Sequence, residues 1–288
     1  MTTTATAWHA PVIDDAQRAA FERDGVVQVR SAISPAWVER MRRFAHAQME
    51  RPSRWVNDQS ATDNSGGRLF TDRYLWRENA EVRAYVFESG IAGVVGALVG
   101  CQRLRFYFDH LLTKAPGTVA RTPWHQDAPY WPFAGRQIAS AWVALTDATI
   151  EGSAMEFVRG SHRWDRTFRP EVFGDAERSS TAAWQTRSAQ EKVPDIEADR
   201  SAYDIVGWDM KAGDAVVFSA WTLHGARGNA TSDQPRIALS TRWLGDDALW
   251  APHPAADPTV TQADVSVQPG QPANDDDRFP IVWRRAGG

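Results

Sequence analysis

The chain has 288 residues, of which 43% are hydrophobic, and its formal net charge is −4. The apolar content is ample for a core, and the charge gives no reason to expect nucleic acid or an anionic membrane as a partner. The single cysteine, Cys101, excludes an internal disulfide and fits a reducing compartment.

The N-terminus lacks the basic and apolar segments of a signal peptide, and the longest apolar run, residues 91–101, is too short to span a bilayer. We therefore expect a cytoplasmic protein. No linker rich in Pro, Gly or Ser divides the chain, so we predict one domain over residues 1–288.

The N-terminal third, residues 14–100, is predicted to be mostly helical. Asp14 or Asp15 can cap a helix that stops at Gly25, and Ser34 precedes Pro35 as an N-cap precedes a first helical residue. The other expected segments are a short strand at 26–30, a polar loop at 51–68 and a helix at 81–99.

From Arg103 onward the sequence pattern changes from helical to short strands separated by turn residues. This pattern favours a β-sandwich or barrel core over residues 103–245. The expected strands cover residues 104–113, 139–146, 155–158, 214–223 and 236–243. The polar span 168–209 is too long for a passive connection, so we expect a lid over the site. The tail, 251–288, is expected to pack back on the barrel through residues 278–283.

His125 and Asp127 are two residues apart in a segment with strand character, so their side chains are expected on one side of a strand. With His224 they would form the two-histidine, one-carboxylate face that binds ferrous iron. If His224 faces the barrel interior, then Phe218, Ala220 and Thr222 face it too, because side chains alternate along a strand. The alternative is that His125 is a hydrogen-bonded core histidine and Asp127 caps a turn.

Several further segments occur in an order typical of one family. They are residues 21–27 (FERDGVV), 114–117 (KAPG), 124–127 (WHQD), 152–163 (GSAMEFVRGSHR), 213–214 (GD) and 224–229 (HGARGN), followed by Arg236. Together they resemble the phytanoyl-CoA dioxygenase family of iron(II)- and 2-oxoglutarate-dependent oxygenases over residues 14–245.

The resemblance implies a mainly β fold with packing helices, built on a double-stranded β-helix of the jelly-roll, cupin-like type. It also implies iron(II) on His125, Asp127 and His224, with 2-oxoglutarate and dioxygen as cosubstrates. The residues expected to contact 2-oxoglutarate are Arg236, Trp142, His110 and Thr113. Relatives often carry serine where this chain has Ala226, and Thr113 or Thr222 can supply the missing hydroxyl.

The implied reaction is hydroxylation of an unactivated C–H bond, and the carboxylate of Asp127 argues against halogenation. Desaturation, epimerisation and cyclisation use the same chemistry and stay open. Two other classes also stay open: a metalloenzyme with another cosubstrate or none, and a non-catalytic jelly-roll binding protein that retains a metal site.

The expected substrate is a small apolar or aromatic metabolite, such as a natural-product intermediate. Tyr130, Trp131 and Phe133 follow Asp127 closely and are expected to wall the pocket. Arg68 and Arg242 are candidates to hold a substrate carboxylate. The sequence carries no sign of the oligomeric state.

Overall fold

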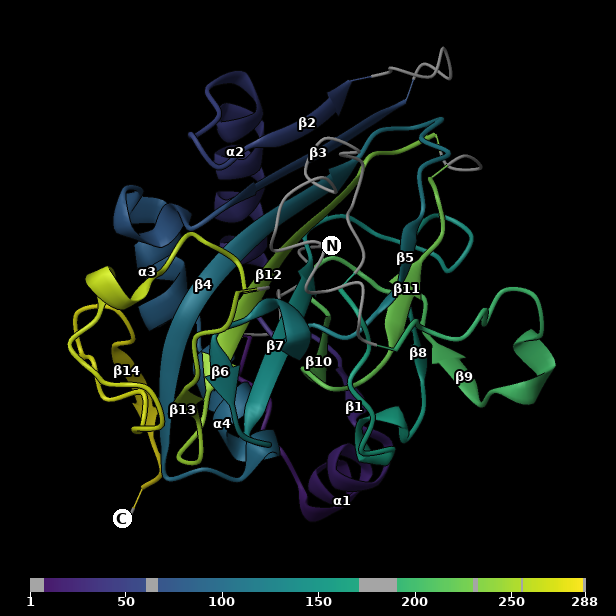
Figure 1. The fold of residues 1–288 in the computed structure, drawn as a ribbon. Coiled ribbons are helices and arrows are strands. Elements are labelled where there is room, and N and C mark those ends of the chain that lie inside the picture. The colour runs from purple at the N-terminus through teal and green to yellow at the C-terminus, as the bar shows by residue number, and fades with distance from the viewer. Residues whose placement is uncertain (1–7, 61–66, 171–190, 230–232, 255, 287–288) are drawn as a thin grey trace.

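A computed structural model describes residues 8–60, 67–170, 191–229, 233–254 and 256–286. Two antiparallel sheets form the body of the protein (Figure 1). The main sheet has the order β1-β10-β7-β12-β4-β3-β2, with β14 also paired to β4, and the minor sheet has the order β5-β11-β8-β9. The expected mainly β architecture is therefore confirmed.

The strands of the main sheet are β1 (Val26–Val29), β2 (Asn57–Ser60), β3 (Arg68–Arg73), β4 (Arg103–Lys114), β7 (Ile138–Ala144), β10 (Ala215–Ser219), β12 (Arg236–Leu244) and β14 (Ile281–Arg284). Those of the minor sheet are β5 (Thr122–His125), β8 (Met155–Val158), β9 (Ile205–Gly207) and β11 (His224–Ala226). A separate pair joins β6 (Phe133–Ala134) to β13 (Leu249–Trp250).

The α-helices among the described residues of the N-terminal third are α1 (Asp15–Asp24), α2 (Pro35–Glu50), α3 (Ala80–Glu88) and α4 (Ile91–Val99). Asp14 caps α1 and accepts from the Gln17 amide, and Gly25 ends this helix with a φ of 75°. Ser34 caps α2 with Pro35 as its first residue. The predicted starts of α1 and α2 are therefore confirmed.

Other boundaries differ from the prediction for local reasons. The helix expected over 81–99 is two helices, because Ser89 ends α3 and Gly90 begins α4 with a φ of 86°. The segment expected as loop contains β2, which pairs with β3. The strand expected over 214–223 ends at Ser219, and the chain turns before β11 begins.

The two faces of the main sheet have different partners. Side chains on one face pack with the helices in the largest apolar cluster, which includes Ile237, Leu239 and Trp243 of β12. The alternate residue Ala238 packs on the other face with Trp142, Phe157 and Phe218. Because Phe157 belongs to β8, this second cluster lies between the two sheets and forms the interior of the barrel.

The C-terminal tail does pack back on the fold, as expected. Its strand β14 pairs with β4, and the Trp283 ring lies over Gly96 of α4. Among the described residues no single helix is long and apolar enough to cross a membrane; α3 and α4 pass that test only as a pair bent by 48°. Most residues of α4 are buried in the helix-facing core.

Two glycines of α4 allow a matched test of the tail contact. A Cβ on Gly96 would lie 2.3 Å from the Trp283 ring, whereas one on Gly93 would lie 3.6 Å from it. We expect Gly96→Ala to destabilise the protein by about 1–3 kcal/mol through overpacking. Gly93→Ala should stabilise it by up to about 1 kcal/mol through helix propensity. Urea unfolding measures both, and equal effects of the two changes would contradict this packing.

Candidate active site and metal centre

The two candidate histidines meet across one pair of strands. His125 ends β5 and His224 begins β11, and the register places them directly opposite each other. Their ring centroids are 4.1 Å apart. Asp127 is not on the strand as predicted, because the chain has turned into helical geometry there, with φ −74° and ψ −42°. The turn nevertheless brings the Asp127 carboxylate between the rings.

Hydrogen bonds orient both imidazoles. Nδ1 of His125 lies 2.8 Å from the Pro123 carbonyl, and Nδ1 of His224 lies 2.9 Å from the Thr222 carbonyl. A carbonyl only accepts, so each Nδ1 carries the hydrogen and each Nε2 presents a lone pair. Oδ1 of Asp127 lies 3.6 Å from Nε2 of His125 and 3.8 Å from Nε2 of His224.

These donor atoms have the chemistry of a ferrous iron site. One ligand atom from each of His125, Asp127 and His224 lies within 4.8 Å of the other two, and all three residues are buried. Burial lowers the pKa of His224 to about 3, and the neighbouring His125 contributes to the shift. A neutral imidazole is the form that binds a metal, and two such rings with one carboxylate form the face typical of non-haem iron.

Asp127 is held as a carboxylate by its surroundings. Burial alone would raise its pKa, but the positive charge of the nearby Arg242 outweighs burial and holds the pKa of Asp127 well below its usual range. Ser140 of β7 donates to Oδ2 at 2.7 Å, and Nε of Arg242 lies 3.7 Å from the same oxygen. Both contacts orient the carboxylate toward the imidazoles.

Arg236 lies at the start of β12 and is buried. Nη1 donates to the Leu112 carbonyl at 3.0 Å, Nη2 lies 3.5 Å from Oγ of Ser153, and Nε has no hydrogen-bond partner. The guanidinium carbon is 5.8 Å from the ring of Trp142. Burial lowers the pKa of Arg236 to about 10, which leaves it charged at neutral pH. Within the described ranges no carboxylate lies within 4.0 Å of it.

Two more basic side chains lie along the same interior face. His110 of β4 is opposite Ser240 on one side and Arg73 of β3 on the other. Arg73 forms a 3.0 Å ion pair with Asp257 of the tail. Sequence reasoning missed Arg73, although the alternation of β3 would have placed it, because the preceding segment was interpreted as loop.

Three expected contacts lie elsewhere. Thr113 is opposite Ile237 and Phe70, and its hydroxyl donates to the Phe70 carbonyl on the helix-covered face. Arg68 also belongs to that face, where Asp58 holds it at 2.7 Å. Thr222 lies in the turn before β11 and donates to the Gly25 carbonyl. None of the three side chains is therefore directed at Arg236, so we do not place them in the site.

The aromatic residues after Asp127 divide into two groups. The Tyr130 ring lies 5.9 Å from that of His125, and Trp131 lies 5.8 Å from the guanidinium of Arg242. Phe133 instead packs with Tyr107, Trp250 and Phe279, away from the ligands. Tyr130 and Trp131 thus border the metal centre, whereas Phe133 is part of the core.

The motif residue Gln126 has a structural task that sequence reasoning did not assign. Its side chain donates to the Arg166 and Trp221 carbonyls and accepts from the Phe168 amide. These bonds tie the start of the 168–209 span to the metal-binding turn. Residues 171–190 of the expected lid lie outside the described residues.

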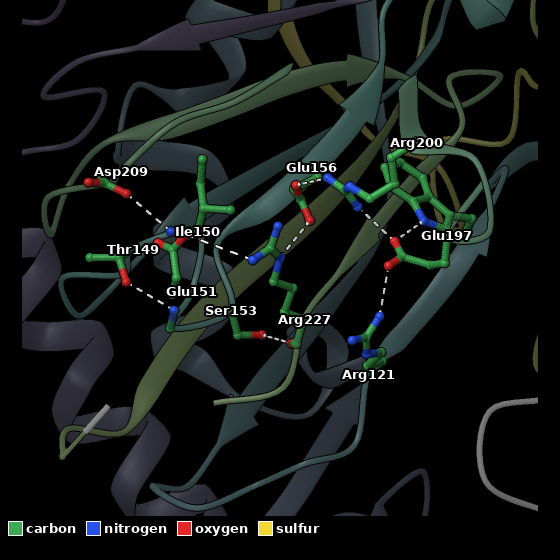
Figure 2. Close-up of polar contacts among 12 residues, drawn as sticks. Arg121, Thr149, Ile150, Glu151, Ser153, Glu156, Glu197, Arg200, Asp209 and Arg227 are labelled. Carbon is green, nitrogen blue, oxygen red and sulfur yellow. Dashed lines mark hydrogen bonds and ion pairs between the residues drawn. The ribbon is translucent and has the colours of Figure 1, made fainter. Parts of the chain in front are cut away.

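The outer face of the minor sheet carries a chain of ion pairs (Figure 2). Glu156 of β8 is buried between Arg200, at 2.5 Å, and Arg227, at 3.3 Å. Glu197 continues the chain by pairing with Arg200 and Arg121 and by accepting from Trp124, the residue before His125. This network stiffens the strands that carry the two histidines, from the side opposite the metal centre.

Comparison with known proteins agrees with this geometry. The sequence model of the phytanoyl-CoA dioxygenase family matches residues 21–238. Dioxygenase hkm4 of Aspergillus hancockii is 32% identical over 136 residues, which cover 45% of this chain and 35% of that protein. The match therefore spans only about a third of that curated relative.

Solved structures share the fold at lower identity. The carbocyclase SnoK from nogalamycin biosynthesis is 23% identical with a TM-score of 0.71 over 94% of this chain and 97% of that chain. The epimerase SnoN, in complex with Fe3+, alpha ketoglutarate and nogalamycin RO, is 22% identical with a TM-score of 0.69 over 93% and 98%. EctD from S. alaskensis, with 2-oxoglutarate and 5-hydroxyectoine, is 18% identical with a TM-score of 0.69 over 93% and 88%.

The family match covers most of the chain and includes all three candidate ligands, and the jelly-roll fold is the one that the solved structures share. The protein therefore belongs to the phytanoyl-CoA dioxygenase family of iron- and 2-oxoglutarate-dependent oxygenases.

Proposed function

We propose that this protein is an Fe(II)- and 2-oxoglutarate-dependent dioxygenase that hydroxylates an unactivated C–H bond of a small apolar or aromatic metabolite. One observation carries the proposal: the buried group of His125, Asp127 and His224 shares the barrel interior with Arg236, a cation without a carboxylate partner among the described residues.

The three ligands would hold iron on one face and leave the opposite face open. With 2-oxoglutarate and dioxygen bound, such an iron supplies the oxidising power to attack an unactivated C–H bond. Arg236 binds the far carboxylate of 2-oxoglutarate, because a guanidinium grips a carboxylate with two parallel hydrogen bonds. Trp142 packs against this guanidinium and restricts its position.

Arg242 and its aromatic neighbours form the substrate side of the site. The guanidinium lies 5.2 Å from the ring of Phe108 and 5.8 Å from that of Trp131, and Tyr74 stacks on Phe108. Flat apolar walls with one cation suit a compact aromatic or apolar molecule that carries a polar or acidic group. His110 borders the same space between Arg73 and Ser240.

Epimerisation and ring closure are the second candidate, because SnoN and SnoK, an epimerase and a carbocyclase, share the fold over nearly the whole chain. Both need the same metal centre. The structure of the product would distinguish epimerisation and ring closure from hydroxylation. Release of succinate would distinguish all three reactions from a binding protein that only retains the metal site.

Removing a metal ligand should abolish function without unfolding the protein. We expect His125→Ala, Asp127→Ala and His224→Ala each to lose iron binding, measured by calorimetry, and succinate release from 2-oxoglutarate. His46→Ala, an exposed histidine of α2, is the control and should behave as wild type. Near-native iron binding and turnover in a ligand variant would remove that residue from the ligand set.

Arg236→Gln should raise the apparent KM for 2-oxoglutarate, since it removes the charged partner of a buried carboxylate. Such a loss costs about 2–5 kcal/mol, or roughly thirty-fold to several thousand-fold in affinity. Arg68→Gln, on the helix-covered face, is the control and should leave the KM unchanged. An unchanged KM in Arg236→Gln with a raised KM in Arg242→Gln would assign the role to the other arginine.

Ser140→Ala should weaken iron binding by about 10–100-fold, because it removes the hydrogen bond that orients Asp127. Ser240→Ala removes another buried hydroxyl, on the neighbouring strand, which bonds to Arg242 rather than to the ligand. Titration with iron under anaerobic conditions compares the two variants. Equal affinities would show that the Ser140 bond does not support the metal ligand.

A further inference from the structure

The C-terminal tail crosses the turn that carries the carboxylate ligand. The Ala251 amide donates to the Pro132 carbonyl at 2.8 Å. The Asp257 amide donates to the Tyr130 carbonyl at 2.7 Å, and the Tyr130 amide donates to the Asp127 carbonyl at 3.0 Å. Along these bonds only Tyr130 separates Asp257 from a metal ligand, so the tail forms part of the wall beside the metal centre.

The side chain of Asp257 reaches the edge of the barrel interior. Its Oδ2 lies 3.0 Å from Nη1 of Arg73, the last residue of β3, and the two side chains are only 14% and 23% exposed. Arg73 is opposite His110 of β4, and His110 is opposite Ser240 of β12. Residues opposite each other in a sheet share one face, so the Arg73–Asp257 pair borders the barrel interior on the β3 side.

The backbone next to Arg73 is strained and firmly held. Tyr74 has a φ of 59°, in the left-handed region that favours glycine. Its amide donates to the Asp109 carbonyl at 3.0 Å, and the Asp109 carboxylate accepts from the two amides that follow Tyr74. The Tyr74 ring stacks on Phe108, with centroids 4.5 Å apart. Strain of this kind is concentrated at ligand-binding sites, and here it gives Arg73 a defined position.

Two polar atoms beside the ion pair are buried without a hydrogen-bond partner. They are Nε of Arg73 and Oγ1 of Thr259, whose amide donates to Oδ1 of Asp257 at 2.9 Å. A buried donor without a partner is costly, so such a group in a binding site indicates a place for a polar atom of a ligand. The guanidinium N–H and the carboxylate offer such a ligand one donor and one acceptor side by side.

The charges along this wall are compensated within the protein. Arg73 is paired with Asp257, and Nε of Arg242 lies 3.7 Å from the Asp127 carboxylate. Burial, and then the charges of Arg242 and Arg73, hold the pKa of His110 well below its usual range, so its ring is neutral at pH 7. An acidic substrate would bring a second carboxylate next to Asp257 and would be repelled by it. A neutral hydroxyl can both donate to Asp257 and accept from Arg73.

We propose that Arg73 and Asp257 bind a hydroxyl group of the substrate, and thereby select a neutral alcohol or phenol over a carboxylic acid. This inference rests on the proposed function, whose substrate class it narrows. The hydroxyl donates its hydrogen to the Asp257 carboxylate, and its oxygen accepts from Nε of Arg73. The rings of Phe108 and Trp131 contact the apolar part of the same molecule.

The test compares three probes on the protein loaded with iron and 2-oxoglutarate, without oxygen. The first, para-cresol, carries the hydroxyl; para-methylanisole replaces it with a methoxy group that cannot donate, and para-toluate replaces it with an acid. Calorimetry at pH 7 measures each dissociation constant. We expect the wild type to bind para-cresol about tenfold more tightly than either other probe. The methoxy group loses a hydrogen bond to a charged acceptor, and the acid adds a repulsion.

Variants of the ion pair should change the affinities of two probes in opposite directions. Asp257→Asn should weaken para-cresol binding about tenfold, because a neutral amide is the weaker acceptor. It should strengthen para-toluate binding, because the repelling charge is gone and Arg73 is left without its partner. Arg73→Gln should weaken para-cresol binding without strengthening that of para-toluate. The control is Asp58→Asn, which breaks the ion pair with Arg68 at the other end of β3 and should leave all three affinities unchanged.

Two results would overturn the inference. The first is a wild-type protein without a preference for para-cresol, whether it binds all three probes equally or none of them. The second is an Asp257→Asn variant that binds all three probes as the wild type does, or that loses affinity for all three alike, as a purely structural ion pair would. Binding of iron and 2-oxoglutarate is measured first on the same samples. A failure there contradicts the proposed function and this inference with it, whereas normal binding there without a probe preference contradicts the inference alone.

Discussion

The pairing of β5 with β11 is the contact on which the site depends. It places His125 opposite His224, and backbone carbonyls two residues before each histidine bind the Nδ1 atoms. Backbone geometry alone therefore sets the tautomer and the direction of both rings. A shift of one residue in this pairing would turn one ring out of the barrel, because side chains alternate between the faces of a strand.

The strand β12 spaces the parts of the site. Its residues 236, 238, 240 and 242 face the barrel interior. Along an extended strand, the Cα atoms of Arg236 and Arg242 are about 20 Å apart. Arg242 lies beside the carboxylate ligand, whereas Arg236 lies beside Lys114 at the other end of the sheet. Under the proposed function, this one strand would separate the substrate side of the site from the cosubstrate side.

Sequence reasoning predicted that His125, Asp127 and His224 gather at one place and that Arg236 faces the interior. It also predicted most of the barrel strands and the helix caps, because each has a local signal: a motif, a period of two, or a capping residue. It misplaced Thr113 and Arg68, since which face of a strand turns inward depends on pairing partners distant in sequence. It assigned no role to Ser140 or Gln126, whose side-chain hydrogen bonds around the metal centre join residues far apart in sequence. Such contacts become visible only when distant segments are brought together.

The arginines of the barrel interior differ in whether a carboxylate of the protein compensates their charge. Arg242 has the permanent carboxylate of Asp127 nearby, and Arg73 has Asp257, so these charges are compensated in the resting protein. Arg236 has only the Leu112 carbonyl and the Ser153 hydroxyl nearby, which orient the guanidinium without neutralising it. Burying this charge without a carboxylate partner carries an electrostatic cost. Under the proposed function, the far carboxylate of 2-oxoglutarate would remove that cost when it binds.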